Sequence, residues 1–186
     1  MSPRHIIFRA LIAVLAFAAV SAFVPVAQGQ AAATPRAAVT DHEKLARSVY
    51  AELVNTNTMD SVGSTTRAAR AMAKRFLDAG FPPEDVTILI PPGDSTKGNL
   101  VVRYHGSGGA NAPKPILLLA HMDVVAALRS DWSRDPFELQ EDNGFFYGRG
   151  SADDKAMASI WVANLLQYKK EAVSYTHLTL PTNREV

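Results

Sequence analysis

Two short polar clusters contain the residues of this chain that could do chemistry. His121 and Asp123 follow an apolar run at residues 116–120, and the adjacent acids Asp153 and Asp154 follow a Gly-Arg-Gly turn. Imidazole nitrogens and carboxylate oxygens are ligands of zinc and related divalent ions. The chain has no cysteine, so any metal must be held by histidine and carboxylates.

Each cluster alone also has a structural explanation. On an extended segment, residues i and i+2 face the same side, so Asp123 could orient a metal-binding His121 or simply partner a core histidine. Adjacent carboxylates repel each other unless a cation or a helix N-terminus lies nearby. Asp153 and Asp154 therefore fit either a metal site or a helix start, with Asp153 as the cap and Asp154 and Lys155 in solvent.

Helical patterns surround these clusters. The first helix is expected to begin at Thr40 or Asp41, the second near Ser64, and the third near Asp154, and Gly80 should end the second. The expected buried faces are Leu45, Val49 and Leu53 in the first helix, Ala69, Met72, Ala73, Phe76 and Leu77 in the second, and Met157, Ile160, Trp161, Leu165 and Tyr168 in the third.

Strand patterns complete the expected fold. Residues 86–90 and 99–104 read as short strands, and Asn143-Gly144 predicts a hairpin turn. The run at residues 116–120 does not alternate, which is typical of a strand buried on both faces. We therefore expect a three-layer α/β domain, in which ligands gather at the carboxyl ends of strands.

Composition and charge exclude some partners. The 186 residues are 47% apolar and 20% charged, with a formal net charge of +1. This balance is ordinary for a globular domain and gives no reason to expect binding to nucleic acid or to an anionic membrane surface.

The two ends of the chain differ from its middle. Residues 1–30 resemble a signal peptide, with Arg4 and Arg9 before an apolar run at residues 10–24. A membrane anchor is the alternative, but the run is shorter than the ~20 residues that span a bilayer. We expect a secreted or periplasmic protein with a linker at residues 31–40. Residues 173–186 match a translated sequencing adapter, so we expect them to be foreign, with a native disordered tail as the alternative.

Together the two clusters resemble the co-catalytic dizinc exopeptidase and deacylase family. Its members include carboxypeptidase G, acetylornithine deacetylase, succinyl-diaminopimelate desuccinylase, aminoacylase and carnosine dipeptidase. The resemblance covers residues 41–172. It is carried by His121-Met122-Asp123-Val124-Val125, Trp132, Asp135-Pro136-Phe137, and Gly148-Arg149-Gly150-Ser151-Ala152-Asp153-Asp154-Lys155.

The resemblance implies a fold and a site. Residues 41–172 would form the N-terminal half of a three-layer α/β zinc-exopeptidase catalytic domain, without its lid and dimerisation domain. His121 would bind one zinc, Asp153 would bridge two, and Asp123 would be the catalytic residue that orients His121. The Asp153-Asp154 peptide bond would be cis. Cobalt or manganese would also suit these ligands.

The resemblance also implies an activity. A metal-activated water would hydrolyse the terminal bond of a small peptide or the amide of an N-acyl amino acid. The family's general-base glutamate, a further acidic ligand and a late histidine match no residue here. We therefore expect an inactive fragment of a homodimeric enzyme that does not contact a membrane once its leader is cleaved. The alternatives are an N-acyl-amino-acid deacylase of the same family and a metal-free binding protein on this fold.

Overall fold

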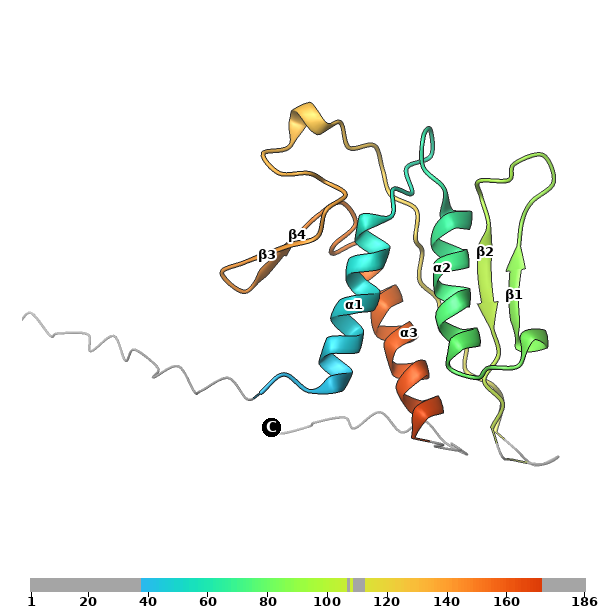
Figure 1. Cartoon of the computed structure of the whole chain (residues 1–186). Coiled ribbons are helices and arrows are strands. Elements are labelled where there is room, and N and C mark those ends of the chain that lie inside the picture. The colour runs from blue at the N-terminus through green and yellow to red at the C-terminus, as the bar shows by residue number, and fades with distance from the viewer. Residues whose placement is uncertain (1–37, 107, 109–112, 172–186) are drawn as a thin grey trace, which may run out of the picture. The chain divides into compact units, whose positions relative to one another are not determined.

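The computed structural model describes residues 38–106, 108 and 113–171 (Figure 1). The expected leader, most of the linker and the expected foreign tail lie outside them. Three α-helices are described, α1 (Asp41–Asn55), α2 (Thr65–Asp78) and α3 (Lys155–Lys170). None of them has the length and apolarity that a membrane crossing requires.

Short strands and 3-10 turns connect these helices. Strands β1 (Val86–Leu89) and β2 (Asn99–Val102) form one antiparallel pair, and β3 (Gln140–Asp142) and β4 (Phe145–Tyr147) form another. The 3-10 helices are η1 (Pro83–Asp85) and η2 (Arg129–Asp131). The mixture of helices and small sheets confirms the predicted α/β class.

Capping determines where the first two helices begin. The Thr40 side chain accepts a hydrogen bond from the Glu43 amide, and the Glu43 carboxylate accepts one from the Thr40 amide. Ser64 accepts a hydrogen bond from the Arg67 amide at the start of α2. These side chains satisfy amides that a first helical turn leaves unpaired. Gly80 follows α2 with a φ of +82°, as its predicted role requires.

The apolar core lies among the three helices. Helices α1 and α3 lie side by side, and the β1–β2 hairpin lies beside α2 (Figure 1). Burial of this shared apolar surface is the main term that favours the folded chain. The buried cluster consists of Val49, Leu53, Ala68, Met72, Phe76, Phe81, Ala158, Val162 and Leu166.

Helix α3 buries a different face from the predicted one. Met157 and Ile160 were expected to face inward, but they are 41% and 46% exposed. The helix is apolar around much of its circumference, so the sequence pattern alone did not identify the face that packs on α1. The prediction for Leu77 was also wrong, because the buried face of α2 ends at Phe76. The buried residues of α3 are Lys155, Ala158, Ser159, Val162, Ala163 and Leu166.

The predicted buried strand at residues 116–120 is not present. Within the part of the chain that the structure describes, no segment pairs with its backbone. Ile116, Leu117 and Leu119 are between 60% and 77% exposed. A strand buried on both faces requires covering elements on both sides, and the described residues do not provide them.

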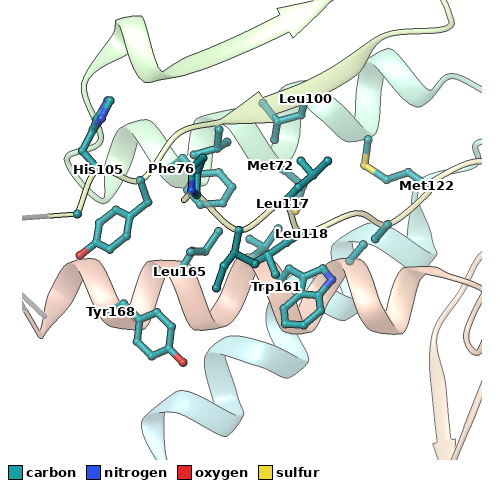
Figure 2. Close-up of a pocket in the computed structure, with 18 of the residues that line it drawn as sticks. Met72, Phe76, Leu100, His105, Leu117, Leu118, Met122, Trp161, Leu165 and Tyr168 are labelled. Atoms are coloured by element: carbon teal, nitrogen blue, oxygen red, sulfur yellow. The ribbon is translucent and has the colours of Figure 1, made fainter. Parts of the chain in front are cut away.

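An apolar cleft lies between this run and α3 (Figure 2). It has a volume of about 820 Å3 and includes Leu118, Met122, Trp161 and Leu165 in its lining. Figure 2 shows α3 along one side of the cleft and the residue 117–122 segment crossing it. Met122 thus turns toward the cleft, whereas its neighbours in sequence line a separate pocket.

Alanine substitutions at a buried and at an exposed position of α3 test its packing. Leu166→Ala should lower the free energy of unfolding by roughly 2–5 kcal/mol, because it removes a buried side chain and leaves a cavity. Ile160→Ala should lower it by about 1 kcal/mol or less, because that side chain is partly in solvent. Urea unfolding of both variants measures the difference, and equal losses would contradict the observed face.

Candidate metal site

The structure brings the two polar clusters into one small pocket. The pocket has a volume of about 250 Å3, with His121 and Asp123 on one side and the turn at residues 148–153 on the other. His121 and Asp123 share this pocket because they are two residues apart on a non-helical segment. The i and i+2 relation read from the sequence therefore describes their placement correctly.

His121 has an acceptor near each ring nitrogen. Its Nε2 lies 3.0 Å from Oδ1 of Asp153. Its Nδ1 lies 3.1 Å from the backbone oxygen of Asp123 and 3.4 Å from Oδ1 of the same residue. The backbone amide of His121 donates to Oδ2 of Asp154 at 3.4 Å. A partner on one nitrogen fixes the ring and leaves the other nitrogen facing the second cluster.

The helix-capping explanation for the second cluster is not supported. Asp154 occupies the N-cap position of α3, yet its side chain makes no capping hydrogen bond. Lys155, expected in solvent under that explanation, is 0% exposed, and burial lowers the pKa of Lys155 to about 8. The Asp153-Asp154 peptide bond is cis, as the family resemblance implied.

The His121 and Asp153 donors have the types and the separation that a zinc site needs, but not the number. Two donors that are each about 2.0–2.1 Å from a tetrahedral zinc lie roughly 3.3 Å apart. Nε2 of His121 and Oδ1 of Asp153, at 3.0 Å, are close to that separation. A catalytic zinc usually has three protein ligands. Within residues 38–106, 108 and 113–171, no group of three or more His, Cys, Asp or Glu side chains could hold a metal ion.

The surroundings of His121 favour its protonated form. Partial burial lowers the pKa of the imidazole, but hydrogen bonds with Asp153 and Asp123 and the charges of both carboxylates act in the opposite direction. The net effect raises the pKa of His121 above its ordinary value of 6.5. In the absence of a metal, His121 therefore holds its second ring proton more readily than a free histidine does.

Close packing brings the second cluster to the first. Gly150 has a φ of +79°, and a Cβ atom there would lie 2.6 Å from Cγ1 of Val124. The hydroxyl of Tyr50 in α1 donates to the backbone oxygen of Ser151 at 2.7 Å. The turn is thus attached to α1 and touches the segment that carries His121.

Sequence reasoning missed three residues around this pocket. Arg149 lines it, and its guanidinium lies 5.0 Å from the centre of the Trp132 ring. Lys155 and Thr58 are buried beside the two clusters, and the side chain of each donates a hydrogen bond to a backbone carbonyl. Arg149 and Lys155 stand inside the second motif, which was an available signal. Thr58 gave none, because its partner Met122 is 64 residues away.

Comparison with known proteins supports the family resemblance that the sequence motifs indicated. Residues 117–180 match the family model described as Peptidase family M20/M25/M40. The chain is 34% identical over 113 residues to an acetylornithine deacetylase of Vibrio campbellii and 30% identical over 139 residues to one of Pasteurella multocida. It is 31% identical over 117 residues to a Cys-Gly metallodipeptidase of Schizosaccharomyces pombe.

These alignments cover much of the chain but little of the relatives. They include 58%, 72% and 61% of this chain, in the same order, and 27%, 33% and 22% of the relatives. The chain therefore spans a third or less of the length of these relatives. The family match also extends past residue 172, where we expected native sequence to stop, and the foreign origin of residues 173–186 stays a prediction.

Alanine at two glycines tests the contact between the clusters. Gly93→Ala should cost about 1–2 kcal/mol, because Gly93 has a φ of +85° but no atom near a Cβ. Gly150→Ala has the same backbone penalty and also forces Val124 to move, which should add roughly 1–3 kcal/mol. Chemical unfolding measures both variants, and a Gly150→Ala loss no larger than that of Gly93→Ala would contradict the contact.

Removal of one carboxylate charge tests the electrostatics. Asp153→Asn should lower the pKa of His121, because the protonated ring then loses a hydrogen-bonded anion. Asp78→Asn at the exposed end of α2 serves as the control and should leave this pKa unchanged. Two-dimensional NMR of the imidazole against pH reports both values. An unchanged pKa in Asp153→Asn would show that the two side chains do not interact in solution.

Proposed function

From the premise that this chain belongs to peptidase family M20/M25/M40, we propose that its protein is a zinc-dependent amide hydrolase. The proposed substrate is a small peptide or an N-acyl amino acid, cleaved at a terminal peptide bond or at its acyl amide. The observation that carries the proposal is the pairing of His121 Nε2 with Asp153 Oδ1 at 3.0 Å, in a pocket shared with Asp123.

The proposed roles follow from the placement of these side chains. His121 would bind one zinc through Nε2, and Asp153 would bridge two. Asp123 lies at the opposite nitrogen of the ring and would keep Nε2 directed toward Asp153. Bound zinc supplies a water of lowered pKa and polarises the amide carbonyl. Cobalt or manganese would also suit this donor set.

The described residues supply fewer donors than the reaction needs. His121 and Asp153 provide one nitrogen and one carboxylate for two metals, and a catalytic zinc usually takes three protein ligands. We propose that the remaining ligands and the general base belong to parts of the protein without a counterpart among the described residues, and that this chain alone is inactive. We also propose secretion or a periplasmic location, from the leader-like residues 1–30, and a homodimer for the full-length enzyme.

Two substrate classes remain within this proposal. The similar proteins include deacetylases and a dipeptidase by name. A leader at residues 1–30 favours the peptidase, because N-acyl biosynthetic intermediates are cytoplasmic. Assay of a full-length protein against acetylornithine and Cys-Gly, each with zinc added, separates the two classes.

Zinc titration of the 186-residue chain tests the metal ligand. The chain should bind zinc more weakly than micromolar and should not hydrolyse either substrate, because its ligand set is incomplete. His121→Ala should abolish this binding. His105→Ala should not, because His105 is exposed and paired with Asp85 away from the pocket. NMR of the ring resonances follows the titration.

Besides a complete absence of zinc binding, two outcomes of this titration would contradict the proposal. Zinc binding that survives His121→Ala would place the metal elsewhere in the chain. Micromolar binding accompanied by turnover would show that the chain already contains a complete site.

A further inference from the structure

We infer that the loop at residues 56–63, between α1 and α2, is a positioning element for the candidate metal site. It acts through two groups. The Thr58 hydroxyl donates a hydrogen bond, and the Thr56 carbonyl accepts one from Lys155. The inference rests on the proposed function for its metal, and on the contacts of the chain itself for its geometry.

The loop holds the segment of the first cluster through Thr58. This residue is 1% exposed, and its hydroxyl donates to the backbone oxygen of Met122 at 2.6 Å. Its own backbone oxygen accepts from the Val124 amide at 3.3 Å. The two hydrogen bonds lie on either side of Asp123, and a parallel bridge joins Met59 to Val124. Residues 122–124 are thereby aligned along the loop, which leaves Asp123 and His121 directed into the pocket.

The same loop holds the second cluster through Lys155. The fully buried ammonium donates from Nζ to the backbone oxygen of Thr56 at 2.9 Å. Thr56 is the C-cap of α1, where carbonyls lack helical partners and the helix dipole favours a cation. Lys155 directly follows Asp153-Asp154, so this hydrogen bond fixes the start of α3 beside the acids.

The loop is itself closed by internal hydrogen bonds. The Gly63 amide donates to the Met59 backbone oxygen at 2.9 Å, and the Ser64 amide donates to that of Asn57 at 3.0 Å. The Asn57 side chain accepts from the Met59 amide at 3.0 Å. A Cβ atom at Gly63 would lie 2.3 Å from the Met59 nitrogen, so the turn leaves no space for a side chain. One compact loop therefore sets the separation of His121 and Asp153.

Substitution of the Thr58 hydroxyl tests this role without added metal. Thr58→Val keeps the shape of the side chain but removes the donor to Met122, so the ring 15N shifts of His121 should move toward those of a solvent-exposed histidine. Thr58→Ser keeps the donor and should retain the original shifts. Thr66→Val is the matched control, because Thr66 is also buried and its hydroxyl accepts from the Gly98 amide in a different part of the fold.

This comparison distinguishes a loss of fold stability from a change in the geometry around His121. Thr58→Val and Thr66→Val should both lower the melting temperature, because each removes a buried hydrogen bond. Only Thr58→Val should change the His121 shifts. If both variants or neither change these shifts, the loop has a merely structural role and the inference is overturned.

Zinc titration of the same variants supplies a second readout. Thr58→Val should raise the dissociation constant for zinc by about tenfold or more, the usual effect of losing a residue that orients a ligand. Lys155→Met, which removes the donor to Thr56, should do the same. Thr58→Ser and Thr66→Val should match the unsubstituted chain. Absence of zinc binding in the unsubstituted chain would refute the metal proposal, whereas the metal-free shifts would still decide the role of the loop.

Discussion

A buried hydrogen bond between the Lys155 ammonium and the Thr56 carbonyl joins the start of α3 to the end of α1. An ammonium group removed from water is strongly unfavourable unless a good acceptor replaces its hydration. The ammonium of Lys155 donates to a carbonyl at a helix end, where the helix dipole adds to the attraction. Because Lys155 directly follows Asp153-Asp154, this contact links the position of the two acids to the packing of α3 on α1.

The features that could be predicted from the sequence are those decided locally. The helix start at Thr40 follows from the capping box with Glu43, and the hairpin turn follows from Asn143-Gly144, both of which have positive φ. The side shared by His121 and Asp123 follows from their spacing. In each case the interacting residues lie within a few positions of each other, so the local sequence is enough to predict the structure.

The features that could not be predicted depend on distant partners. The exposed side of α3 and the uncovered run at residues 116–120 differ from expectation because apolar composition shows that a surface needs covering, but not what covers it. Thr58 belongs to a loop without any chemical signal and acts on Met122 far along the chain. The ligand types were thus evident from the motifs, whereas the residues that fix their positions became visible only in the fold.

The exposed run at residues 116–120 makes the chain prone to self-association in solution. Ile116, Leu117 and Leu119 expose large side chains on a segment whose backbone pairs with no other described residue. Such a segment is a template for intermolecular β-pairing. The chain should therefore aggregate at high concentration and be recognised by chaperones, and a charged residue introduced at Leu117 should improve its soluble yield.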